Sequence, residues 1–136
     1  MGVRRLSHIG IAVRDLEAAV AVYERALGLP VSHRERLESE GIEAASFRLG
    51  EVEIELMQPL AEDTPVGRFL ARRGEGVHHL AYEAEDVGAV LAEARAAGLE
   101  TLDSEPRPGL GGSRVAFIHP RSLNGVLTEL VQPGEE

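Results

Sequence analysis

The chain has 136 residues, enough for one domain or for two small halves that share a core. It lacks cysteine, which excludes disulfides, zinc fingers and cysteine nucleophiles, and its 14 basic residues are all arginine, which excludes lysine chemistry. The formal net charge of -9 argues against binding to nucleic acid. Because charged residues interrupt positions 1–30, we expect no signal peptide, no membrane association and a cytoplasmic location.

Two stretches of the chain follow the same pattern. Residues 8–28 and residues 79–98 each open with a histidine and several apolar residues, then reach an aspartate and an apolar-periodic segment that ends in glycine. The two histidines, His8 and His79, are 71 positions apart, as 79 − 8 shows. This spacing indicates an internal repeat.

A second pair of motifs supports the repeat. ELMQP at 55–59 matches ELVQP at 129–133, so that Glu55 and Glu129 are 74 positions apart (129 − 55). Because both pairs occur in the same order, chance similarity is a poor explanation. The sequence therefore predicts one domain, residues 1–136, built from two related halves at about 3–60 and 76–133.

The apolar periodicity predicts the same order of elements in both halves. Each opens with a strand, continues with a helix capped by Asp15 or Asp86 and ended by glycine, and finishes with three strands. The predicted fold class is therefore α+β, with two tandem βαβββ modules that form a curved mixed sheet. The expected strands cover 6–13, 31–37, 44–49, 51–58, 77–84, 99–102, 114–119 and 126–132.

Two further segments have clear local signals. Between the halves, Pro65 follows possible capping residues and Gly74 follows an apolar stripe, which predicts a short helix. The stretch from Glu105 to Ser113 is rich in proline and glycine and is expected to be a loop.

The repeat makes His8 and His79 equivalent, and likewise Glu55 and Glu129. If the halves pair around a pseudo-twofold axis, the four side chains converge. Two imidazoles and two carboxylates suit a divalent ion in octahedral geometry and leave two positions for water or substrate. Strand parity places Glu129 among apolar neighbours, where an acid is costly unless it is paired or bound to metal. We expect the other histidines to be structural or exposed: His33, His78 and His119.

Several motifs extend the argument to a family. The chain resembles methylmalonyl-CoA epimerases of the vicinal oxygen chelate superfamily from about Leu6 to Pro133. The two blocks most typical of these epimerases are GEGVHHLAY and HPxxxNGVLTEL. The matching segments are HIGIAV at 8–13, YERALGL at 23–29, IELMQPL at 54–60, VGRFLARRGEGVHHLAY at 66–82, EPRPGLGGSRVAFIHP at 105–120 and NGVLTELVQ at 124–132.

The resemblance implies a metal-dependent enzyme that interconverts the two epimers of methylmalonyl-CoA through an enolate. It implies the same four metal ligands, His8, Glu55, His79 and Glu129, with Co²⁺ expected first and Mn²⁺, Ni²⁺, Fe²⁺ or Zn²⁺ as alternatives. Glu129 is then the first candidate for the catalytic base, and Glu55 is its partner by pseudo-symmetry. The other implied partners are a small acyl-CoA substrate and a second copy of the chain in a homodimer.

The sequence departs from the family pattern at two positions. The family often carries glutamine where this chain has Glu55, and some epimerases carry a glutamate where this chain has Ala44. The neighbouring Glu43 is aimed at the opposite strand face by parity. The second acid/base group therefore stays open at this point, as do the coenzyme A contacts, for which Arg107 and Arg114 are candidates.

Two other functions fit the same pattern of elements. A glyoxalase-type isomerase would apply enolate chemistry to a thiol hemithioacetal, and a ligand-binding protein of this fold would need no metal. The two epimerase blocks argue against the glyoxalase-type isomerase. The four candidate metal ligands argue against the binding protein, which would not need to keep them. Turnover of each substrate and a metal analysis would separate the three functions.

Overall fold

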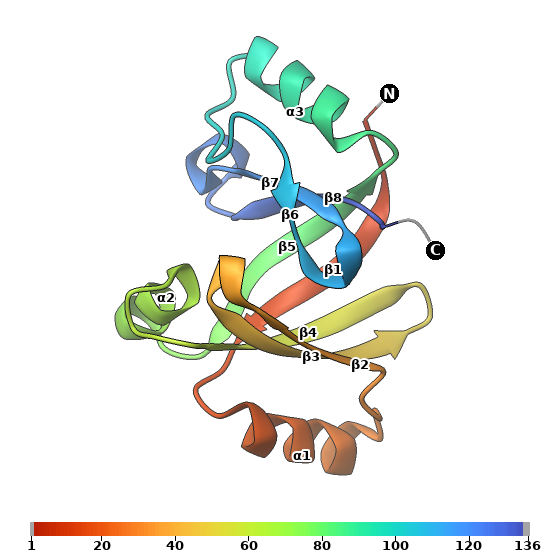
Figure 1. Ribbon diagram of the computed structural model, residues 1–136, viewed down its shortest axis with the longest axis vertical. Coiled ribbons are helices and arrows are strands. Elements are labelled where there is room, and N and C mark those ends of the chain that lie inside the picture. The colour runs from red at the N-terminus through yellow and green to blue at the C-terminus, as the bar shows by residue number, and fades with distance from the viewer. Residues whose placement is uncertain (1, 135–136) are drawn as a thin grey trace. The chain divides into compact units, whose positions relative to one another are not determined.

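The computed structural model describes residues 2–134, and within them it contains three α-helices and eight strands (Figure 1). None of these helices combines the length and the apolar character that crossing a membrane would require. In chain order the elements are β1 (Val3–Ala12), α1 (Leu16–Leu27), β2 (His33–Leu37), β3 (Ile42–Leu49), β4 (Val52–Pro59), α2 (Pro65–Arg73), β5 (Gly76–Ala84), α3 (Val87–Ala96), β6 (Arg107–Pro108), β7 (Arg114–Ile118) and β8 (Thr128–Gln132).

The chain divides into two compact units. The first unit comprises residues 8–78, and the second unit comprises residues 79–136 together with residues 1–7. The first half of the chain reads β1-α1-β2-β3-β4 and the second reads β5-α3-β6-β7-β8, with α2 between them. The predicted α+β class and the two βαβββ modules are therefore confirmed.

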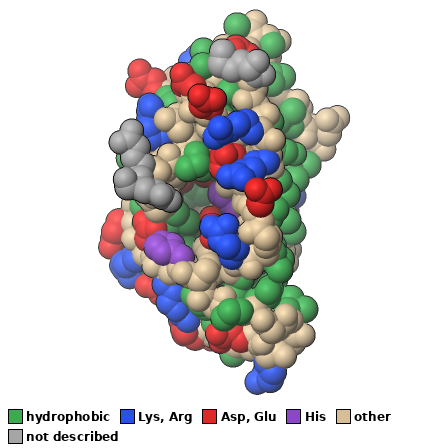
Figure 2. All heavy atoms as spheres, turned by 90° about the vertical axis from the view of Figure 1, so that its right-hand side faces the viewer, with side chains coloured by type: hydrophobic (Ala, Val, Ile, Leu, Met, Phe, Trp, Pro, Cys, Tyr) green, Lys and Arg blue, Asp and Glu red, His purple; other side chains and the backbone are tan. Residues whose placement is uncertain are grey.

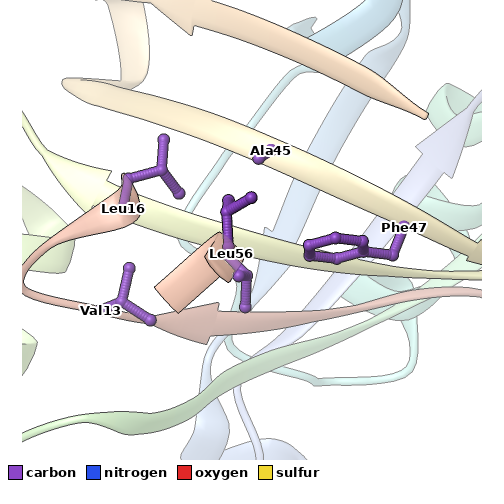
Figure 3. Packing of buried hydrophobic residues seen from close by; sticks show 6 residues of the cluster. Val13, Leu16, Ala45, Phe47 and Leu56 are labelled. Carbon is purple, nitrogen blue, oxygen red and sulfur yellow. The ribbon is translucent and has the colours of Figure 1, made fainter. Parts of the chain in front are cut away.

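The strands of the first unit follow the order β2-β3-β4-β1. β1 runs parallel to β4, and the other neighbours are antiparallel. Helix α1 packs on one face of these strands, where Phe47, Leu56 and Ala45 are completely buried against Val13 and Leu16 (Figure 3). Because side chains alternate along a strand, the residues between these core positions lie on the opposite face.

Local signals fix the position of α1. The Asp15 carboxylate accepts a hydrogen bond from the main-chain N–H of Ala18, and Gly28 ends the helix with a φ of 65° in the left-handed region. The main-chain N–H of Leu16 donates to Oε1 of Gln58 on β4, at 2.7 Å. The helix start is thus tied both to its own cap and to the sheet beneath it.

The second unit repeats this plan. Its strands follow the order β5-β8-β7-β6, with β5 parallel to β8. Asp86 caps α3, and the N–H of Val87 donates to Gln132 at 3.0 Å, as Leu16 does to Gln58 in the first unit. Leu91 on α3 is buried in a cluster with Ala116 and Leu130.

A buried acid joins the first residues of the chain to the second unit. Glu83 on β5 is buried, and its two carboxylate oxygens accept hydrogen bonds from Arg4 at 3.0 Å and from Arg5 at 3.1 Å. Two cations offset the cost of burying one carboxylate. These contacts explain why residues 2–7 belong to the second unit.

One predicted strand is wrong. Residues 99–102 form no strand; only Thr101 makes an isolated bridge to Ile118. The strand that follows α3 in the second module is instead the two-residue β6, inside the expected loop of residues 105–113. The side chain of Asp103 explains the difference. Its carboxylate accepts a hydrogen bond from the main-chain N–H of Phe117, so a neighbouring strand cannot pair with that N–H.

The other boundaries agree more closely. The expected short helix between the halves is α2, capped by Thr64 with Pro65 in its first turn. β8 starts two residues later than predicted, because a 3₁₀ helix at Pro120–Leu123 precedes it. Asn124 ends that 3₁₀ helix with a φ of 59°.

Candidate metal-ligand pairs

The first unit contains a buried histidine-carboxylate pair. His8 on β1 and Glu55 on β4 lie on the sheet face opposite α1, and Nδ1 of His8 is 3.4 Å from Oε2 of Glu55. Each residue is 7% exposed. A carboxylate at this depth needs a hydrogen-bond donor, a positive charge or a metal ion.

The second unit contains the equivalent pair. Nε2 of His79 on β5 is 3.0 Å from Oε1 of Glu129 on β8, and the two residues are 4% and 8% exposed. The strand registers correspond as well, since Gly10 lies opposite Glu55 and Ala81 lies opposite Glu129. The sequence repeat thus corresponds to the same local arrangement of histidine and glutamate, once in each unit.

The carboxylate of Glu129 has apolar and aromatic neighbours. Phe117 on β7 lies directly opposite it, and the Phe117 ring meets the His79 ring edge-to-face with centroids 5.6 Å apart. Ala81, Val115 and Val131 form a buried cluster on the same strands. This part of the second unit is therefore largely dry.

Asp103 and Arg107 make a group of polar contacts around Phe117 that the sequence did not reveal. Asp103 Oδ1 accepts the Nε–H of Arg107 at 2.8 Å, while Asp103 Oδ2 accepts the main-chain N–H of Phe117 at 2.8 Å. The guanidinium carbon of Arg107 lies 5.2 Å from the centre of the Phe117 ring. Asp103 follows the segment that was wrongly predicted as a strand, and no motif marks it. Arg107, a candidate coenzyme A contact, is placed on β6.

The corresponding face of the first unit is lined by small residues. Ser46 on β3 lies opposite Glu55, and Ala44 lies two residues away on the same face. On β2, His33 lies opposite Ser46 and Glu35 lies opposite Ala44. Nε2 of His33 is 3.0 Å from Oε1 of Glu35. Glu35 was not among the predicted site residues, and its position follows from the pairing of β2 with β3.

Three expectations about individual residues are met. Glu43 lies opposite Gln58, whose side chain bonds to α1, so Glu43 is on the α1 side as parity predicts. His33 is exposed. The other two histidines have structural contacts: His78 packs edge-to-face on Phe69, and His119 accepts the main-chain N–H of Arg121.

The charges visible on the molecular surface are mixed. Figure 2 shows acidic and basic side chains interspersed on the face it presents, without one sign dominating. This distribution agrees with the net charge of -9 in giving no support to nucleic-acid binding.

A family comparison matches most of the chain. Residues 7–117 match the Glyoxalase/Bleomycin resistance protein/Dioxygenase superfamily. An ethylmalonyl-CoA/methylmalonyl-CoA epimerase from Cereibacter sphaeroides is 41% identical over 130 residues, which cover 94% of this chain and 97% of that protein.

Solved structures give the same result. A variant of the Streptomyces coelicolor methylmalonyl-CoA epimerase, in complex with 2-nitronate-propionyl-CoA, has a TM-score of 0.96 and 41% identity, over 98% of this chain and 100% of that one. A methylmalonyl-CoA epimerase in complex with methylmalonyl-CoA and NH4+ has a TM-score of 0.94 and 42% identity, over 97% and 96% of the two chains.

Proposed function

This chain belongs to the methylmalonyl-CoA epimerase family of the glyoxalase/bleomycin resistance protein/dioxygenase superfamily, and we propose that it interconverts (R)- and (S)-methylmalonyl-CoA through an enolate. The observation that carries the proposal is the buried histidine-carboxylate pair, which occurs once in each unit at equivalent positions. Sequence identity of 41% to an epimerase over nearly the whole of both chains supports it.

The four residues of the two pairs fit one divalent cation. Imidazole nitrogens and carboxylate oxygens are ligands for first-row divalent metals, and all four side chains are buried. His8, Glu55, His79 and Glu129 would hold the ion, with Co²⁺ as the first candidate. When bound, such a cation supplies Lewis-acid stabilisation of negative charge on the substrate oxygens, an effect of several kcal/mol.

The residues divide the proton transfer between them. Glu129 takes the α-proton, which lies between the thioester carbonyl and the carboxylate of the substrate, and its dry surroundings strengthen charge interactions. The histidine of each pair orients its carboxylate, at 3.4 Å in one unit and 3.0 Å in the other. By equivalence, Glu55 is the first candidate for the acid that acts from the opposite side of the substrate.

The proposal has further parts. The two modules act as one domain over residues 1–136, the chain forms a homodimer, and it works in the cytoplasm. Arg107 and Arg114 are candidates for contacts to the anionic groups of coenzyme A. Each of these statements is part of the proposal and can be tested separately.

Activity on purified protein tests the proposal directly. The protein would be supplied with each divalent metal in turn and incubated with a single epimer of methylmalonyl-CoA, and the appearance of the other epimer would be followed. A glutathione hemithioacetal serves as the competing substrate, and elemental analysis gives the metal content. Turnover of the hemithioacetal alone would replace epimerase by a glyoxalase-type function. Ligand binding with no metal and no turnover would favour a binding protein.

A further inference from the structure

Inversion at the α-carbon needs two proton-transfer groups, one on each side of the enolate plane. The proton leaves from one side, and a different proton arrives from the other. In the proposed function, Glu129 and Glu55 are both metal ligands, which limits how far either can move. A second acid on the same sheet face, outside the ligand set, would meet the requirement better.

The strand registers of the first unit place such an acid. One row across the sheet runs from His33 through Ser46 and Glu55 to Gly10. The next row contains Glu35, Ala44, Met57 and Ala12. Directly paired residues in neighbouring strands share a face, so Glu35 lies on the same face as Glu55.

The β3 residues that lie between the two carboxylates have short side chains. β2 and β4 are separated by two strand spacings, about 10 Å. Between the position of Glu35 and that of Glu55, β3 contributes the short side chains of Ala44 and Ser46 to this face, and both residues are buried. These short side chains suit a small branched acyl group, with the carboxyl group of Glu35 at one edge and that of Glu55 at the other.

The alternation along β2 sets Glu35 apart from its neighbours. Arg34 and Arg36 project to the other face, where they pair with Glu17 and Glu38 at 2.6 and 2.8 Å. The hydrogen bonds that these arginines donate to the glutamate carboxylates raise the pKa of both guanidinium groups above the ordinary value. Glu35 is thus the acid that β2 turns toward the face of Glu55, and the His33 ring lies against it at 3.0 Å.

The second unit carries a different residue at the equivalent place. Phe117 lies opposite Glu129 as Ser46 lies opposite Glu55, and two residues earlier Val115 pairs with Arg107 as Ala44 pairs with Glu35. At this position the two modules therefore differ: the second carries a cation, Arg107, and the first carries a carboxylate, Glu35. The two modules keep the same histidine and glutamate but carry different residues at the sheet edge. This difference suits a substrate whose two ends differ.

We infer that Glu35 is the second acid/base group of the proposed epimerase, with His33 as its positioning residue and Glu55 as a metal ligand only. In one direction the α-carbon–hydrogen bond breaks, its proton goes to the Glu129 carboxylate, and its electron pair enters the enolate. The protonated carboxyl group of Glu35 then gives its proton to the opposite side of the α-carbon. In the reverse direction the two carboxyl groups exchange roles.

The test is Glu35→Gln, with Glu43→Gln as the matched control on the opposite face of the adjoining strand. We expect Glu35→Gln to lower epimerisation at least about 100-fold, the lower end for losing a general acid/base. In D₂O, one epimer should still exchange its α-proton at nearly the wild-type rate, because Glu129 is intact, while the other should not. Glu43→Gln should behave as wild type in both assays.

Three results would count against this inference or its premise. Epimerisation by Glu35→Gln within about threefold of Glu43→Gln would remove Glu35 from the reaction. Loss of exchange for both epimers with metal bound would make its role structural. If the wild-type protein neither epimerises nor exchanges either epimer, the proposed function itself fails and the inference falls with it.

The role of His33 has its own readout. His33→Ala should lower kcat up to about tenfold and leave KM unchanged, because the histidine orients Glu35 and does not bind substrate. His33→Gln, which keeps a side-chain N–H donor, should restore most of kcat. An increase in KM, or no rescue by glutamine, would contradict a positioning role.

Discussion

The two units hold the same histidine-carboxylate pair in different surroundings. In the second unit, Glu129 faces the ring of Phe117 and lies beside a buried apolar cluster. In the first, Glu55 faces the hydroxyl-bearing Ser46 and has Gly10 on its other side. The ligand chemistry is thus repeated, whereas the neighbours differ: an aromatic ring lies opposite Glu129, and the small residues Ser46 and Gly10 lie beside Glu55.

This difference gives the two halves separate tasks. A dry, rigid setting strengthens charge interactions and holds a base in one orientation, which suits Glu129. The short side chains beside Glu55 suit the substrate and the acid proposed to act from its far side. Mutations that remove the shared chemistry should have the largest effects, and those that alter only the surroundings should have smaller ones.

The largest effect is expected from removing a ligand. We expect the wild-type protein to bind about one divalent ion per chain, and His79→Ala to abolish tight binding and with it turnover, by about 10³-fold or more if Lewis-acid stabilisation is lost. His8→Ala should act similarly, because both pairs serve one ion. Elemental analysis after dialysis gives the metal content. Retention of metal at native affinity by either variant would contradict the shared ligand set.

The next effect separates the two carboxylates. Glutamine is nearly isosteric with glutamate and can still ligate through its carbonyl oxygen, so Glu129→Gln should retain some metal. It cannot accept a proton, and epimerisation should fall at least about 100-fold. If Glu55 is a metal ligand only, as inferred above, Glu55→Gln keeps a ligating oxygen and should be much more active. Equal losses in the two variants would mean that the different surroundings do not divide the tasks.

Much of this arrangement could be predicted from the sequence because it depends on repetition. The equivalence of His8 with His79 and of Glu55 with Glu129 follows from spacing, and strand parity gives the face of each residue. The structure brings His8 close to Glu55 and His79 close to Glu129 within their units. Their binding of one common ion stays a prediction.

Cross-strand contacts were harder to predict. The position of Glu35 depends on which residue of β3 it pairs with, and the register is set by the turn at Glu38–Glu40 and Gly41. Asp103 was missed because its role consists of two long-range hydrogen bonds, to Arg107 and to the main chain of Phe117. Local sequence patterns carry no information about such pairings.

A moderate effect is expected at Asp103. Asp103→Ala would leave the main-chain N–H of Phe117 without its acceptor and free Arg107 from its ion pair. Losing a buried acceptor costs about 1–3 kcal/mol of unfolding free energy. Chemical denaturation measures this loss, and metal content measured in parallel should change little. A stability within about 0.5 kcal/mol of wild type would mean that Asp103 does not fix the Phe117 strand.

The smallest effect is expected in the first unit, at Ser46, which lies opposite Glu55. Ser46→Ala removes one hydroxyl from the position equivalent to Phe117 and keeps the side chain there short. A typical hydrogen bond contributes about 0.5–1.5 kcal/mol net, so unfolding free energy should fall by no more than that. Metal content and turnover should stay within about threefold of wild type, since neither proposed role involves the hydroxyl. Thermal denaturation and a metal assay on the same sample check both points. Loss of metal from this variant would show that the Ser46 hydroxyl orients Glu55, and Ser46 would then be part of the ligand support, as Phe117 is for His79.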